Sequence, residues 1–299
     1  FNQIVASAMI FSLRYFLIAL LLLWSSAAFA SPTSKIADFY KDAKWNVFPV
    51  PIFKTSPSEG KTYGLMPVVI ASDTNCNLKT IVGNAYTYNK ITGLSSFLAA
   101  YIYPREETML HFFAEYAQRF AREATVKFHH LPQGKGSIIF GGKLSYIQYP
   151  FRRFFGFGPA TLQTNETNYV GENFELESFG GFRFFDSLSL TYKQNFIIQK
   201  LHDRAINNIN DTKQTFAGDN QVVGSNNFIH TLEASYDTHE NPSFSDRGEM
   251  LSLAYLTSLA KLGSDFTFQG YDLKGKLTRS LGSKRFTTVI FAKLSQRFG

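Results

Sequence analysis

The chain has 299 residues, a formal net charge of +7 and a single cysteine, Cys76. One cysteine excludes a fold held together by disulfides within the chain. The basic excess excludes little by itself, but Lys and Arg are scattered along the sequence instead of forming the basic stripe typical of a nucleic-acid-binding protein. No nucleic-acid partner is therefore expected.

The chain begins with an export signal. Arg14 precedes an apolar run over residues 16–23, and the small-residue exit Ala28-Phe29-Ala30 follows. This pattern predicts a secretory signal peptide cleaved after Ala30. A membrane anchor is the alternative, but the run is shorter than the roughly 20 residues that a spanning helix needs. Residues 1–8 precede Met9 and look like sequence upstream of the true start.

The rest of the chain is rich in aromatic residues, with 31 Phe and 15 Tyr, and its dominant hydrophobic period is two. Such alternation is typical of half-buried or membrane-crossing strands. The predicted strands cover residues 63–71, 80–88, 94–103, 109–119, 125–131, 138–149, 174–177, 188–199, 228–236, 250–262, 266–277 and 286–298. His230 interrupts the apolar face of one of them.

These strands favour a transmembrane β-barrel over a soluble β-sandwich. They are longer than the usual five or six residues of a soluble strand, their polar faces carry charges, and Tyr and Phe gather at their ends as in an interfacial girdle. With the export signal, the pattern predicts an integral protein of the bacterial outer membrane. Outer-membrane lipid and lipopolysaccharide phosphates are then the expected partners of the basic excess.

We expect three parts: upstream residues and signal peptide at 1–30, a mostly irregular periplasmic lead-in at 31–60, and the barrel at 61–299. The longest polar interruption, residues 200–227, is predicted to be an extracellular loop. The charges of Glu175, Glu177, Lys193 and Glu233 should line the lumen.

Two stretches, YPFRRFFGFGPATLQTNETNY and YDTHENPSFSDRGEMLSLAY, resemble barrels of the bacterial surface antigen family, the BamA/TamA type of outer-membrane protein. PIFKTSPSEGKTYGLMPVV resembles that family's first barrel strand. The resemblance runs from about Pro51 to the end of the chain. The first stretch implies an aromatic-Gly-x-Gly segment with Gly156 and Gly158. The second implies a periplasmic hairpin in which Asp237 and Arg247 are partners.

In that hairpin, Pro242 would fix the bend and Gly248 would restart the next strand. The chain departs from the family because it has no room for POTRA domains and lacks the Arg-Gly-aromatic loop motif. We therefore expect an incomplete, open antiparallel barrel that has lost several C-terminal strands.

The resemblance implies a role in inserting or translocating other proteins, with client β-barrel or secreted proteins as partners and no covalent chemistry, cofactor or metal. A porin-like passive channel is the alternative. An outer-membrane hydrolase is a further hypothesis, with His239 and Asp237 activating Ser243 or Ser245, but neighbouring positions on a tight turn seldom form a productive triad. His129 and His130 are predicted to end a strand and not to bind metal.

The predicted strands leave one inconsistency. Suppose that residues 200–227 are extracellular and residues 237–247 periplasmic. Counting back through every predicted strand then starts the first strand on the extracellular side. The N-terminus, however, should be periplasmic. The expected error lies between Glu106 and Leu131, where two predicted strands would be one bent strand.

Overall fold

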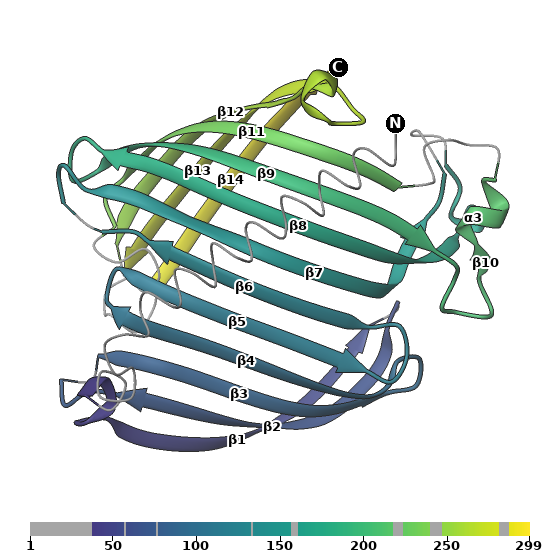
Figure 1. Ribbon diagram of the computed structural model, residues 1–299, viewed down its shortest axis with the longest axis horizontal. Helices are drawn as coiled ribbons and strands as arrows, with labels where there is room; N and C mark the ends of the chain where they lie inside the picture. The colour runs from purple at the N-terminus through teal and green to yellow at the C-terminus, as the bar shows by residue number, and fades with distance from the viewer. Residues whose placement is uncertain are drawn as a thin grey trace, which may run out of the picture. The chain divides into compact units, whose positions relative to one another are not determined.

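The computed structural model describes residues 38–56, 58–75, 77–132, 134–156, 161–217, 224–239, 247–280 and 287–299. They form an all-β protein whose strands lie side by side in the order of the chain (Figure 1). The strands are β1 (Lys44–Ser56), β2 (Gly60–Ser72), β3 (Leu78–Asn89), β4 (Gly93–Arg105), β5 (Thr108–Ala117), β6 (Arg122–His130), β7 (Ile138–Phe154), β8 (Thr167–Arg183), β9 (Leu188–His202), β10 (Asn210–Asp211), β11 (Gly224–Asp237), β12 (Gly248–Ser258), β13 (Phe268–Ser280) and β14 (Thr287–Phe298).

The chain divides into two compact units, Phe1–Trp45 with Ala71–Leu78, and Asn46–Ile70 with Lys79–Gly299. In the smaller unit, residues 38–40 form a helical turn, and the ring of Tyr40 lies 5.3 Å from that of Trp45. The same unit holds a turn in which the Asp73 carboxylate accepts hydrogen bonds from the backbone N–H groups of Asn75 and Asn77, both at 2.8 Å.

The larger unit contains nearly all of the antiparallel sheet. The consecutive pairs from β3 to β9 are antiparallel, as are β9–β11, β11–β12, β12–β13 and β13–β14. Only the two-residue β10, which pairs in parallel with β8, leaves this path. Within the described residues, β1 and β14 are the two ends of the strand order and do not pair with each other. The predicted all-β, open antiparallel sheet is confirmed.

Period-two alternation explains why these residues form strands. In β9, Leu188 and Leu190 are exposed, whereas the intervening Ser189 and Thr191 are partly buried. Because successive side chains of a strand point to opposite faces, a shift by one residue would exchange the two sets. The hydrophobic pattern therefore holds the strand register.

The expected irregular lead-in at residues 31–60 is wrong from Lys44 onward, because β1 occupies Lys44–Ser56. Pro49 and Pro51 make this strand hard to predict from the sequence. Proline cannot donate a ladder hydrogen bond and is unfavourable in a central strand. The strand order places β1 at an edge of the sheet, where an N–H group can face away from the neighbouring strand. Residues 31–37 of the expected lead-in, and the signal peptide, lie outside the described residues.

The proposed merging of two strands between Glu106 and Leu131 is also wrong. β5 and β6 are separate strands, paired from Thr108 with His130 to Tyr116 with Arg122. The missing strand is β1, and its inclusion removes the inconsistency in the strand count. With β1 counted, nine strands instead of eight precede the long segment after β9.

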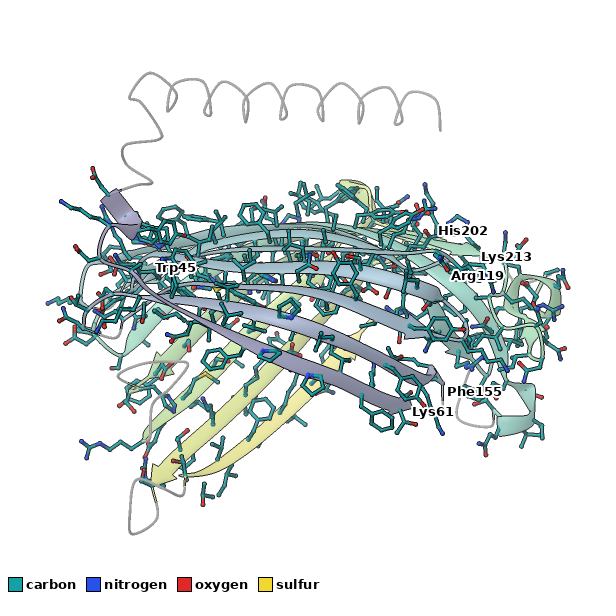
Figure 2. All side chains as sticks on the ribbon, turned by 90° about the horizontal axis from the view of Figure 1, so that it is seen from below. Trp45, Lys61, Arg119, Phe155, His202 and Lys213 are labelled. Atoms are coloured by element: carbon teal, nitrogen blue, oxygen red, sulfur yellow. The ribbon has the colours of Figure 1, made fainter. Side chains whose placement is uncertain are left out.

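The strands of the larger unit have two distinct ends. Figure 2 shows Lys61, Arg119, Phe155, His202 and Lys213 together at one of them. The connections after β5, β7, β9 and β12 share this end, because every strand on the path reverses direction. We call it the loop end, since it carries the long segment between β9 and β11.

Candidate functional site

The first functional surface is an apolar face shared by neighbouring strands. Leu190, Ala234 and Leu253 lie opposite one another on β9, β11 and β12. Leu253 is opposite Leu273 on β13, which is opposite Leu294 on β14. The exposed fractions of Leu253 and Leu294 are 53% and 69%. These residues define the outer face, which presents contiguous rows of large apolar side chains.

The opposite, inner face carries polar and charged groups. Lys143 on β7 forms a 2.6 Å ion pair with Glu175 on β8, and Lys193 on β9 lies 3.6 Å from Glu177. Asn195 donates a 3.0 Å hydrogen bond to Glu175. These partners link three adjacent strands across one face. The charged positions assigned to the lumen from the sequence thus share the face opposite the apolar rows.

The inner face is concave. Tyr149 on β7 donates a hydrogen bond to Glu59, in the turn between β1 and β2, and Glu59 also binds Lys54. Neighbouring strands lie about 4.8 Å apart, so a flat sheet would separate β7 from β2 by roughly 24 Å. Two side chains cannot bridge that distance, and the sheet must curve around the inner face. The sequence carried no signal for this contact.

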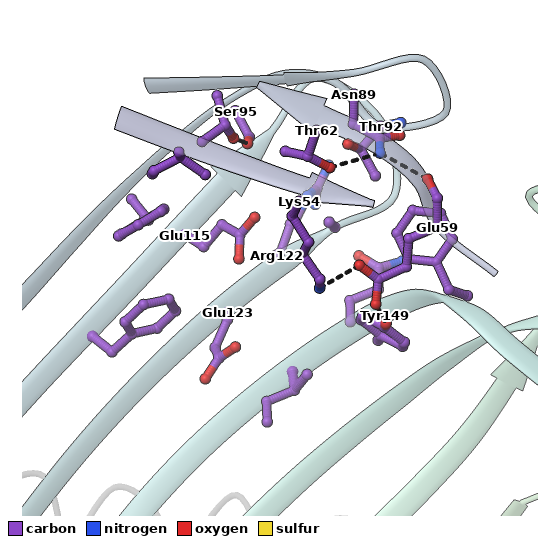
Figure 3. A pocket seen from close by; sticks show the side chains of 18 residues that line it. Lys54, Glu59, Thr62, Asn89, Thr92, Ser95, Glu115, Arg122, Glu123 and Tyr149 are labelled. Atoms are coloured by element: carbon purple, nitrogen blue, oxygen red, sulfur yellow. Dashed lines mark hydrogen bonds and ion pairs between the residues drawn. The ribbon is translucent and has the colours of Figure 1, made fainter. Parts of the chain in front are cut away.

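A cavity of about 250 Å³ lies beside this contact on the inner face (Figure 3). Asn89 closes one side by donating 2.8 Å and 3.0 Å hydrogen bonds to the Glu59 carbonyl and the Thr62 hydroxyl. Glu115 and Glu123 reach the cavity from directly opposite positions on β5 and β6. The cavity has mixed polar and aromatic walls.

Burial raises the pKa of the Glu59 carboxyl, but hydrogen bonds from Lys54 and then Tyr149 lower it, and the net pKa lies below the ordinary value of 4.5. Glu59 lies outside the strands, and its side chain is 17% exposed. The ionised carboxylate is therefore the form that holds the turn against β7.

The hairpin between β11 and β12 holds Asp237 and His239, two neighbouring titratable residues that the sequence analysis named. The Asp237 carboxylate lies 2.6 Å from Nδ1 of His239 and accepts the backbone N–H of the same residue at 2.9 Å. Nε2 of His239 lies 3.1 Å from the Thr278 hydroxyl on β13. The side chain of His239 is only 2% exposed, so it joins the hairpin to the next strand.

Gly248 is required at the restart of the strand. Its φ angle is +147°, and a Cβ atom there would lie 2.7 Å from Cγ of His239. Arg247 is exposed next to it, and its predicted partnership with Asp237 remains a prediction. Pro242 lies outside the described residues, as do Ser243 and Ser245 of the hydrolase hypothesis.

The segment after β7 contains Gly156, which has a φ angle of +105°, and a Cβ atom added there would lie 3.8 Å from the ring of Phe216. Gly158 is outside the described residues. The long segment after β9 folds back here, because Asn168 on β8 accepts hydrogen bonds from the N–H groups of Ala205 and Ile206 at 2.9 Å and 3.0 Å. Asn168 is fully buried. Sequence reasoning missed this residue.

The side chains of His129 and His130, the other two histidines considered from the sequence, do not lie together. His129 and His130 are consecutive on β6 and therefore point to opposite faces. Nδ1 of His130 lies 2.8 Å from the Thr108 hydroxyl. Within the described ranges, no group of three or more His, Cys, Asp and Glu residues is arranged to hold a metal ion.

The structure defines a class of protein: an antiparallel β-sheet with an apolar outer face and a charged, concave inner face. No helix in the described part of the chain is both long and apolar enough to cross a membrane. No protein-family model and no curated protein matches the sequence. The chain is similar in structure to BamA from Haemophilus ducreyi lacking POTRA domains 1–3, with 13% identity and a TM-score of 0.44. The match covers 91% of this chain and 49% of that structure, so the chain spans about half its length.

Proposed function

We propose that this chain is an outer-membrane β-barrel protein, exported by a signal peptide that is cleaved after Ala30. The observation that carries the proposal is the outer face, where rows of large apolar side chains cross adjacent strands in register. In water these rows would be an aggregation surface. In a bilayer they are the surface that the hydrocarbon requires.

The strand lengths support the same environment. β9 has 15 residues and β12 has 11, and a tilted strand needs about 9–11 residues to cross the hydrocarbon layer. The backbone of each interior strand is paired on both sides, which avoids the cost of unsatisfied groups in lipid. Lipid and lipopolysaccharide are the partners of this surface in the proposal.

We propose further that the protein acts without covalent chemistry, inserting or translocating client β-barrel or secreted proteins. The support is the resemblance of residues 149–169 and 236–255 to surface antigen barrels. The mechanism would be strand addition: an incoming strand pairs its main chain with an exposed sheet edge, because unpaired N–H and C=O groups are costly in lipid.

A passive channel is the second candidate. It is favoured by the ion-paired inner face, where Lys143 and Glu175 lie among other polar groups. Purified protein in planar bilayers distinguishes the two functions. Large, steady currents would support a channel, whereas accelerated folding of a client barrel in liposomes without such currents would support assembly activity.

The membrane location is tested by a matched pair of substitutions. Leu253→Lys places a charge at the middle of β12 on the outer face, and should cost about 2–4 kcal/mol at the bilayer midplane. Thr191→Lys places the same charge on the inner face, opposite Glu233, and should be tolerated. We expect Leu253→Lys alone to reduce the compact, heat-modifiable form in outer-membrane fractions. Equal yields for the two variants would contradict the proposal.

A further inference from the structure

A second pocket, of about 300 Å³, lies at the end of the sheet opposite the loop end. It is lined by Pro104, Arg105, Thr108, Phe128, His130 and Phe140. Arg105 ends β4, Thr108 begins β5 and His130 ends β6, so the pocket lies at the margin of these three strands. We call it the margin pocket.

The margin pocket belongs to the outer face. Phe140 on β7 is opposite Gly180 on β8, which is opposite Tyr192 on β9, two residues from Leu190. Because side chains alternate along a strand, Phe140 shares the outer face with Leu190. The exposed fraction of Phe140 is 45%. Gly180 leaves the space next to Phe140 open, since a Cβ atom added there would meet nothing within 4 Å. The pocket therefore opens toward the layer that the proposed function assigns to lipid.

The margin pocket has apolar walls and a polar rim. The Phe140 ring lies 5.7 Å from that of Phe128 and 5.2 Å from that of His130. Nδ1 of His130 lies 2.8 Å from the Thr108 hydroxyl. When that hydroxyl donates to Nδ1, the neutral ring carries its hydrogen on Nε2 and can donate it to a ligand. Arg105 adds an exposed guanidinium, and no ion pair of the described residues involves it.

The chemistry of the outer face changes in order with depth along these strands. The polar rim stands at the strand ends, and Phe128 lies two residues further in, or roughly 7 Å. Deeper still, Phe112, Val126 and Leu144 lie opposite one another on β5, β6 and β7, with exposed fractions of 38%, 41% and 39%. A cation at the margin, aromatic rings next and exposed apolar side chains beneath them match a phosphate headgroup that continues into an acyl chain.

We infer that the margin pocket binds a glycerophospholipid of the surrounding membrane. Its phosphate accepts hydrogen bonds from Arg105 and from Nε2 of His130, and one acyl chain lies against Phe128 and Phe140. A guanidinium matches phosphate oxygens in a bidentate geometry. A free phosphate ion would leave the apolar walls without a partner, whereas a lipid uses both parts of the pocket. This inference rests on the proposed membrane location.

The turn after Arg105 bears on the charge of the headgroup. Glu106 and Glu107 follow directly in the chain and do not line the pocket. Carboxylates beside a phosphate site repel a headgroup of net negative charge and attract an ammonium group. A zwitterionic, amine-bearing lipid of the phosphatidylethanolamine type therefore fits the margin pocket better than an anionic phosphatidylglycerol.

Native mass spectrometry of the purified protein in a neutral detergent tests the inference. The probes are dioleoyl phosphatidylethanolamine, dioleoyl phosphatidylglycerol, dioleoylglycerol without a phosphate, and inorganic phosphate without acyl chains. We expect phosphatidylethanolamine to be retained best, and Arg105→Gln to reduce its retention about tenfold, as for the loss of one charge-assisted hydrogen bond. Arg279→Gln is the matched control, because Arg279 lies at the same end of the sheet and is already paired with Glu249.

Each probe has an outcome that would contradict part of the inference. Equal retention by the parent and Arg105→Gln, both in the compact form, would overturn the site. Dioleoylglycerol retained as well as phosphatidylethanolamine would overturn recognition of the phosphate, and better retention of phosphatidylglycerol would overturn the headgroup charge. Binding of inorganic phosphate in preference to the lipids would overturn the lipid as occupant.

The compact, heat-modifiable form is measured separately in outer-membrane fractions of cells. Its absence there in the parent chain would contradict the proposed membrane location. Its presence, together with unselective lipid retention by the purified protein, would contradict the margin pocket alone.

Discussion

At the scale of single residues, the hairpin cluster has a structural role in the arrangement observed. His239 is buried, and its two ring nitrogens are occupied by Asp237 and Thr278. A hydroxyl nucleophile must be accessible to its substrate, but Thr278 is only 2% exposed. The sequence alone suggests that His239 is a dispensable turn residue, whereas its contacts extend across to β13.

We expect Gly248→Val to lower the thermal stability of the compact form more than His239→Ala does. Valine would have to adopt a positive φ angle and displace His239, whereas His239→Ala removes hydrogen bonds and leaves their partners unsatisfied, at about 1–3 kcal/mol. His202→Ala, at a 46% exposed side chain, is the control and should change little. The temperature at which the compact band disappears in gel electrophoresis measures all three.

The contacts of the Glu59 carboxylate with Tyr149 and Lys54 should be sensitive to acid. Its folded pKa is below the ordinary value of 4.5, so its stabilisation is present above that pH and is lost as the pH falls through the folded pKa. Glu59→Gln should therefore lower the thermal stability of the barrel at pH 7, and the difference from the parent should shrink well below pH 4.5. A difference that is constant with pH would argue against an ionised Glu59.

At the scale of elements, the segment after β9 is more structured than its polar sequence predicts. β10 pairs with β8, and α3 (Thr212–Thr215) follows it, with Asp211 as its N-cap. The Thr212 hydroxyl donates a 2.9 Å hydrogen bond to that of Thr167, and both residues are buried. Composition alone could not reveal this, because Asn and Asp favour solvated loops as readily as anchored ones.

Asn168→Ala should release this segment. The Asn168 amide also donates to the Pro150 and Arg152 carbonyls of β7, both at 2.9 Å, so the substitution leaves groups on β7 and in the segment without partners. We expect protease added to intact cells to cut residues 203–217 faster in Asn168→Ala than in the parent. Gln163→Ala, at an exposed position of a short 3₁₀ helix, is the control. Equal cleavage of all three proteins would refute the anchoring role.

At the scale of the molecule, inclusion of β1 makes the strand count agree with the expected periplasmic start of the first strand. The proposal places the loop end outside the cell and the β11–β12 hairpin in the periplasm. A membrane-impermeant maleimide on intact cells should label Lys213→Cys and Lys261→Cys, but not Lys135→Cys or Asp186→Cys, all in a Cys76→Ser background. The reverse pattern would invert the topology, and permeabilised cells provide the check that every site is reactive.

Sequence by itself determined the all-β class, the two faces of the sheet and most strand positions, because strand alternation is a local property that each segment carries alone. Leu190 and Lys193 could be assigned to opposite faces from their spacing. Only the tertiary structure decided that the Pro-containing β1 joins the sheet and that Glu59 contacts Tyr149. It also decided that Asn168 binds the segment after β9. The polar His230 on the apolar face proved to lie opposite other polar residues, in a row that crosses five strands. These contacts join residues far apart in the chain, and they exist only once strand order, register and curvature bring those residues together.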